Sequence, residues 1–283
     1  MTQVPKCTHS QKARGIIIDR LARRYAGLRN AMAFVVYAFT LLPTLIVIPI
    51  SFGGAGEMSF PPSNWTLELY EQLFSSSAWV SSILQSTKVS CLATLLAILI
   101  AVPAAYGLGR FDFPGKRLVL FLVMSPMVVP VVVTSLGLYL YFSRLHLVGT
   151  TIGLVLSHVA YVTPFVVITV MAGVNKLDPA LELAASIMGA KRLAVLLKVV
   201  LPQLRPSIIA GALFAFLMSF DEVVIAWFIT SPETTTLPVK MYTSVQWEIS
   251  PIIAAVSALL TMLSIVFCCL SIFLLPGTAE PSR

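Results

Sequence analysis

The sequence contains few charged residues. Only 11% of its 283 residues are Asp, Glu, Lys or Arg, whereas 58% are hydrophobic. Soluble domains carry about 25% charged and about 45–50% apolar residues, so this composition excludes a water-soluble globular protein and a disordered chain. It also argues against a nucleic-acid-binding protein, because the basic residues behind the net charge of +7 stand in short stretches between apolar blocks.

Residue patterns typical of catalytic and metal sites are absent from the sequence. Its 4 cysteines and 3 histidines form no CxxC pair and no Cys/His ligand spacing. There is no GxxxxGK[ST], HExxH or GxSxG motif. We therefore expect no catalytic residue, no metal site and no nucleotide site in this chain. His158 lies inside an apolar run, where it either joins helices by a hydrogen bond or contacts a substrate.

Apolar segments long enough to cross a membrane recur along the chain. A spanning helix needs about 20 mostly apolar residues. Because backbone groups in lipid must be paired within the chain, we predict an all-α, polytopic membrane protein with six transmembrane helices over residues 31–276, flanked by tails at 1–30 and 277–283. The candidate spans are 31–52, 78–108, 118–142, 152–174, 207–230 and 251–275.

The basic residues are distributed unevenly between the two sides of these spans. Of the 19 lysines and arginines, sixteen lie in the N-terminal tail, in the loops 109–117 and 175–206, or at the C-terminus. Positively charged loops remain in the cytoplasm. Both termini and the loop 175–206 are therefore predicted to be cytoplasmic, and the loop 53–77 is predicted to be periplasmic.

The long cytoplasmic connection, 175–206, is patterned like two short helices. Asp178-Pro179 is typical of a helix start, with Asp as the N-cap and Pro at the first helical position. Apolar residues then recur at helical spacing until Gly189 ends the helix. A second amphipathic stretch, 193–200, is predicted to stop at Leu201-Pro202. Such a pair of helices either lies on the membrane or presents a surface to a soluble partner.

This segment resembles the EAA motif of binding-protein-dependent ABC importer permeases. That motif reads Glu-Ala-Ala, three residues, Gly, nine residues, Ile, one residue, Leu-Pro. This chain departs from it at two places: Leu183 stands at the Glu position, with Glu182 just before it, and Val199 replaces Ile. The resemblance implies a type I permease fold, and it implies that this segment is the coupling helix that docks into a groove of an ATPase subunit. The expected coupling residues are Glu182, Ala184, Ala185, Gly189, Leu201 and Pro202.

Further motifs are similar to those of spermidine/putrescine permeases, especially the second of the two permease subunits in such systems. They are Phe220-Asp221-Glu222-Val223-Val224, residues 231–238, and Glu248-Ile249-Ser250-Pro251. The resemblance implies ATP-driven import of a polyamine across a bacterial inner membrane. The implied partners are a second homologous permease, two copies of an ATPase and a periplasmic binding protein. This chain would bind no cofactor, because ATP and Mg²⁺ are used by the ATPase. Other small amino compounds, such as an aminophosphonate or an opine, stay open as substrates.

Asp221 and Glu222 are the only acids well inside a candidate span. An intramembrane charge faces a cavity or a partner, so these acids either attract a cationic substrate or pair within the bundle. Trp227, near the outer boundary, contributes either a cation–π contact or an interfacial belt residue. Tyr161 lies at mid-depth of the fourth span. We name Asp221, Glu222, Trp227 and Tyr161 as candidate pathway residues.

Two other classes of membrane protein have to be weighed. A self-sufficient secondary transporter would use Asp221 and Glu222 as ion sites, and it predicts internal repeats. No clear repeat is visible in the sequence. A membrane enzyme would need a catalytic constellation, which the sequence lacks.

Overall fold

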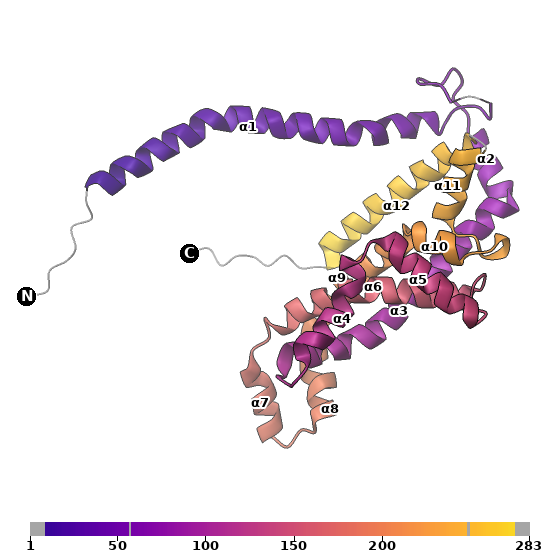
Figure 1. Cartoon of the computed structure of the whole chain (residues 1–283). Coiled ribbons are helices and arrows are strands. Elements are labelled where there is room, and N and C mark those ends of the chain that lie inside the picture. Colours follow the sequence, from indigo (N-terminus) through magenta and orange to yellow (C-terminus); the bar gives the residue numbers. More distant parts are fainter. Residues whose placement is uncertain (1–8, 57, 248–249, 275–283) are drawn as a thin grey trace, which may run out of the picture.

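The computed structural model describes residues 9–56, 58–247 and 250–274, and over these residues the regular secondary structure is helical, with no β-strand (Figure 1). A π-helical turn (Leu196–Val200) and a 3₁₀ turn (Pro232–Thr234) accompany the α-helices. The α-helices are α1 (His9–Ile50), α2 (Glu68–Ser75), α3 (Ser77–Arg110), α4 (Lys116–Val128), α5 (Val131–Arg144), α6 (Thr151–Val174), α7 (Pro179–Ile187), α8 (Arg192–Val195), α9 (Leu201–Phe220), α10 (Val224–Ile229), α11 (Leu237–Trp247) and α12 (Ile252–Leu274).

Several of these helices have the length and composition of membrane spans. Four qualify over the described residues: Arg29–Ile50 within α1, α3, α6 and the continuous stretch Arg192–Phe220. The pair α4 and α5 counts as a fifth span if its two halves are taken together, and Ile252–Val266 of α12 is a shorter apolar helix. Each of the six predicted segments therefore falls on helical structure, and the chain is a multi-pass membrane protein.

The third predicted segment, 118–142, is not a straight helix. It divides into α4 and α5, which are bent by 106° relative to each other. Pro130 at the bend has no N–H to donate and holds the preceding Val129 in an extended conformation, with φ −76° and ψ 133°. The predicted segment is therefore broken at Pro130, where the two helices are sharply bent.

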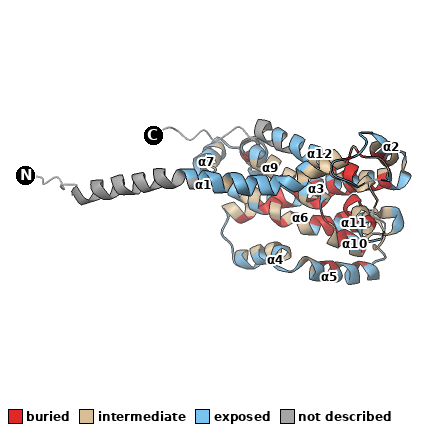
Figure 2. Ribbon diagram, turned by 90° about the horizontal axis from the view of Figure 1, so that it is seen from above, coloured by how far each residue is buried: buried red, intermediate tan, exposed pale blue. Residues whose placement is uncertain are grey.

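α1 stands apart from the rest of the molecule. Helical structure begins at His9 and so continues through most of the segment predicted as a tail. Within Arg29–Ile50, 0% of the most apolar stretch is buried. α1 runs apart from the other helices in Figure 1, and most of its coloured residues are marked as exposed in Figure 2. Among the described residues, α12 is the only helix that packs against α1 to a substantial extent. The apolar side chains of α1 are thus available to lipid or to another subunit.

The core lies where α3, α6 and α9 pack together. Small residues on α3, such as Ala97 and Ala101, meet valines of α6, such as Val162 and Val166. Small side chains let membrane helices approach closely, which strengthens their van der Waals packing. At Gly173 of α6, an added Cβ would collide with the side chain of Ser207 on α9.

The two ends of the bundle carry different elements. α7 and α8 lie at one end, and α2 and α11 lie at the opposite end (Figure 1). The opposite end is closed by an apolar cluster in which Leu69 and Leu73 of α2 contact Trp79, Leu237 and Val256. The predicted coupling segment therefore lies at the end of the bundle that is opposite to α2 and α11.

Candidate functional site

The first candidate site is the coupling segment, residues 178–202. The Asp178 carboxylate accepts a hydrogen bond from the backbone N–H of Ala180 at 2.9 Å, and Pro179 opens α7. The predicted helix start is therefore confirmed. At Gly189 the backbone φ is +86°, and no atom lies within 4 Å of the position a Cβ would take. The left-handed conformation, rather than lack of space, favours glycine at this turn.

The second helix of the segment does not stop at Leu201-Pro202, contrary to the prediction. The π-helical turn joins α8 to α9, so the helix from Arg192 to Phe220 is continuous. Pro202 stands in the first turn of α9, directly after the wider π turn, and the side-chain amide of Gln203 donates to the carbonyl of Val199 at 2.8 Å. Because this wider turn can absorb the proline, the segment is directly continuous with a spanning helix.

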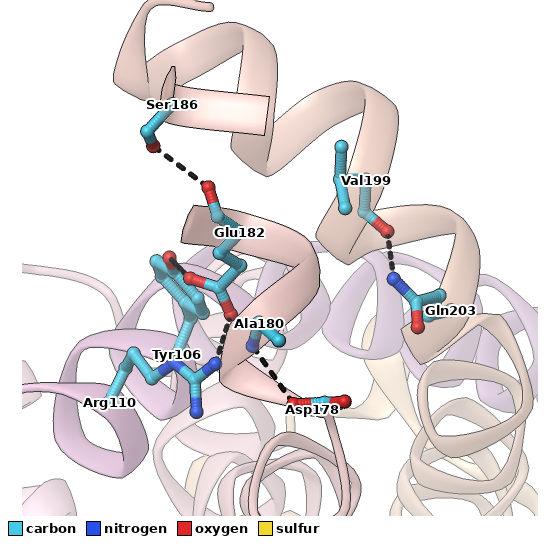
Figure 3. A network of polar contacts seen from close by, with 8 residues as sticks. All are labelled: Tyr106, Arg110, Asp178, Ala180, Glu182, Ser186, Val199 and Gln203. Carbon is cyan, nitrogen blue, oxygen red and sulfur yellow. Dashed lines mark hydrogen bonds and ion pairs between the residues drawn. The ribbon is translucent and has the colours of Figure 1, made fainter. Parts of the chain in front are cut away.

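Glu182 of α7 faces the bundle (Figure 3). The hydroxyl of Tyr106 donates to its Oε2 at 2.8 Å, and the guanidinium Nη2 of Arg110 lies 2.8 Å from its Oε1. The side chains of Arg110 and Glu182 are only 18% and 16% exposed. Both carboxylate oxygens are thus engaged within this chain.

The outer surface of the coupling segment is apolar and exposed. Leu183, Ile187, Met188 and Leu193 are 62%, 78%, 87% and 66% exposed. Ala184 and Gly189 also lie on the surface, whereas Ala185 and Leu201 pack against the core and Pro202 is half-buried. Contiguous exposed apolar side chains mark an interaction surface.

The second candidate site is a break in the fifth predicted segment, 207–230. α9 ends at Phe220 and α10 begins at Val224, so the prediction of one unbroken helix was wrong. Glu222 is 8% exposed, and its Oε1 accepts hydrogen bonds from the backbone N–H groups of Val224 at 2.8 Å and Ile225 at 2.9 Å. The first N–H groups of a helix have no partner within that helix, and this carboxylate accepts hydrogen bonds from two of them. Glu222 therefore caps the start of α10.

The structure brings three of the four candidate pathway residues together. Asp221 is exposed at the break, directly before the buried Glu222, and Tyr161 on α6 lies within electrostatic range of both acids. Trp227 belongs to a different group. Its ring stands edge-on to Tyr242, with centroids 5.2 Å apart, and it lines a cavity of about 470 Å³ together with Glu233.

Three further polar residues were not singled out from the sequence. The hydroxyl of Ser219 is hydrogen-bonded to Nδ1 of the buried His158 at 2.8 Å. This bond joins α6 to α9, which fits the helix-packing alternative for His158. Tyr106 and Arg110 hold Glu182. The sequence does mark Arg110 as a basic residue in the last turn of a helix, where a positive charge is favourable. No local pattern, however, predicts that Arg110 or Tyr106 contacts Glu182, which lies 72 or 76 positions further along the chain.

Comparisons with known proteins agree with this architecture. Residues 93–276 match the family described as "Binding-protein-dependent transport system inner membrane component". "Spermidine/putrescine transport system permease protein PotC" of Haemophilus influenzae is 29% identical over 248 residues, which cover 86% of this chain and 95% of that protein. "Putrescine transport system permease protein PotI" of Escherichia coli K12 is 34% identical over 232 residues, covering 79% and 82%.

A solved structure supports the fold. A chain of a bacterial ABC transporter involved in the import of the acidic polysaccharide alginate superimposes with a TM-score of 0.71 and 16% sequence identity, covering 89% of this chain and 96% of that chain. The arrangement of helices is thus the type I permease fold. The protein belongs to the family of binding-protein-dependent transport system inner membrane components, and it is a permease subunit of an ABC importer.

Proposed function

We propose that this permease forms one half of the translocation path for a polyamine and couples to a separate ATPase through residues 178–202. The exposed apolar surface of the coupling segment carries this proposal. Its residues project from one end of the bundle, on a hairpin whose second arm runs directly into the spanning helix α9. A groove in a soluble subunit would cover these side chains.

The ATPase is proposed as a separate chain. This sequence has no phosphate-binding GxxxxGK[ST] motif, so ATP and Mg²⁺ would be bound by the partner and this chain would hold no cofactor. Each permease presents one coupling segment. Two permeases would therefore engage two ATPase copies.

The second permease is supported by the apolar surface that this chain leaves uncovered. Phe34 and Phe39 of α1 are 73% and 78% exposed. An apolar cavity of about 440 Å³ also opens between α2, α3, α9, α11 and α12, where Phe216 and Phe220 line it. A homologous subunit packing on these faces would complete a pathway that a single copy does not enclose.

The proposed orientation rests on the positive-inside rule. Arg110 contacts the coupling segment, so the basic residues of that segment and those at the end of α3 lie at one end of the bundle. Glu68 and Glu71 of α2 lie at the opposite end, on the side of the predicted periplasmic loop. We propose that the coupling end and both termini are cytoplasmic, in a bacterial inner membrane, and that the binding protein docks at the α2 and α11 end.

The substrate is proposed from the relatives and from the acids at the helix break. The relatives are named for putrescine and spermidine transport. An exposed carboxylate at Asp221 suits an ammonium group on its way through the membrane. Trp227, with Glu233 in the cavity at the outer end, would meet the substrate earlier on the same path.

Uptake by reconstituted vesicles tests the proposal. The complete complex should import labelled putrescine or spermidine only when ATP and the ATPase are present, and an aminophosphonate or an opine should not compete. Import that continues without the ATPase would favour a secondary transporter instead. Selective import of the aminophosphonate or the opine would keep the ABC permease and replace the polyamine.

A further inference from the structure

The contact between Glu182 and α3 fixes the coupling segment to a second spanning helix. Tyr106 and Arg110 stand four residues apart on α3, so both side chains project from the same face of the helix. Each reaches one oxygen of the Glu182 carboxylate, at 2.8 Å in both cases (Figure 3). Among the described residues, these are the only polar side-chain contacts that join α7 to another helix.

The partners are placed so that the contact persists. The Arg110 and Glu182 side chains are largely shielded from water, at 18% and 16% exposure, so their attraction is screened less than that of a surface pair. The ring of Tyr106 stands edge-on to Phe111, with centroids 5.8 Å apart. Arg110 also lies in the last turn of α3, where a positive charge is favourable.

Without this contact, α7 would be joined to the bundle mainly through its connections in the chain and apolar packing. The second arm of the hairpin continues into α9 through the π-helical turn. A displacement of the coupling segment by an ATPase would then reach α9 directly. It would reach α3 only through apolar packing against α9 and α6.

We propose that Glu182, Arg110 and Tyr106 form a latch that transmits movement of the coupling segment to α3 at the same time as to α9. Glu182 is in this view a positioning residue. It ties α7 to the helix that carries Ala97, Ala101 and other core residues opposite α6. The two helices that flank α6 would thus tilt together. The inference rests on the proposed coupling to an ATPase.

The test uses the complete transporter in vesicles and measures substrate imported per ATP hydrolysed. Glu182→Gln and Arg110→Gln should lower this ratio about fivefold or more, the range of typical coupling free energies. Tyr106→Phe, which removes one neutral donor, should lower it less. Exchanging the charges, with Glu182→Arg and Arg110→Glu together, should restore part of the ratio.

A matched control exists at the same end of the bundle. Lys116 and Asp112 form an ion pair of 2.9 Å in which Asp112 is 99% exposed and neither residue belongs to the coupling segment. Lys116→Gln should leave the ratio unchanged.

Two results would overturn the latch. In the first, the Glu182 and Arg110 variants form less complex, but the complex that does assemble imports a normal amount of substrate per ATP. That result would indicate a merely structural role. A direct role in ATPase docking would release the ATPase from the Glu182→Gln complex, and exchanging the charges would not rescue it. If the unmodified complex shows no ATP-driven uptake at all, the proposed function fails, and the latch fails with it.

Discussion

At the scale of single residues, the Glu222 carboxylate stabilises the start of α10 inside the membrane. It accepts hydrogen bonds from two backbone N–H groups that have no helical partners. Glu222→Ala should lower the free energy of unfolding by about 1–2 kcal/mol, because those N–H groups lose their acceptor. Glu222→Gln keeps an acceptor oxygen and should cost less. Thermal unfolding in detergent measures both, with the exposed Glu233→Ala as the control. Equal stability of Glu222→Ala and the unmodified protein would contradict this role.

Asp221 differs from its neighbour because its side chain is exposed. Asp221→Asn should therefore leave folding and assembly unchanged but raise the KM for a polyamine several-fold, since it removes an attraction for the cation. The difference between the two proteins should shrink as salt is added, because salt screens exposed charges. Unchanged uptake kinetics would remove Asp221 from the pathway.

The sequence could identify these two acids but could not assign their roles. Residues 218–224 contain no glycine or proline, so no local signal marks the end of α9. Adjacent acids point in different directions, and the hydrogen bonds to Val224 and Ile225 form only because the helix breaks there. Tertiary structure therefore decides that one of the two acids caps a helix while the other is exposed.

At the scale of elements, the turn at Gly189 sets the angle between α7 and the helix that follows. Gly189→Val should uncouple ATP hydrolysis from import, because a side chain in the left-handed region costs about 1–2 kcal/mol and the turn would rearrange to avoid it. Gly115, in the loop before α4, has nearly the same φ, +87° against +86°, and equally open surroundings. Gly115→Val therefore applies the same strain away from the coupling segment and should leave coupling intact. Equal losses in both variants would contradict a specific role for the turn.

The start of α7 was predictable because an Asp-Pro pair specifies a helix N-terminus locally. The continuity of α8 with α9 was not, because prolines usually end a helix and a π-helical turn has no comparable sequence signal. The break at Pro130 was not predictable either, although there the proline does interrupt the helix. Identical residue types gave a continuation at Pro202 and a sharp bend at Pro130, depending on the surrounding packing.

At the scale of the whole molecule, composition and charge placement were sufficient to predict a multi-pass helical membrane protein. Hydropathy reports which segments are apolar, and it does not report which of them touch. The contact of Glu182 with Tyr106 joins residues 76 positions apart, and the exposure of α1 depends on which faces the other helices cover. These features required the assembled structure.

The central claim is that an ATPase engages this permease through the exposed surface of the coupling segment. The most direct measurement compares Ile187→Asp with Phe113→Asp for binding of the ATPase to the purified permease complex. Ile187 is 78% exposed on the coupling segment, and Phe113 is 42% exposed in the loop before α4. A charge placed in an apolar interface should weaken binding about tenfold or more, so we expect Ile187→Asp to lose the ATPase and Phe113→Asp to retain it. Full ATPase binding by Ile187→Asp would contradict the account.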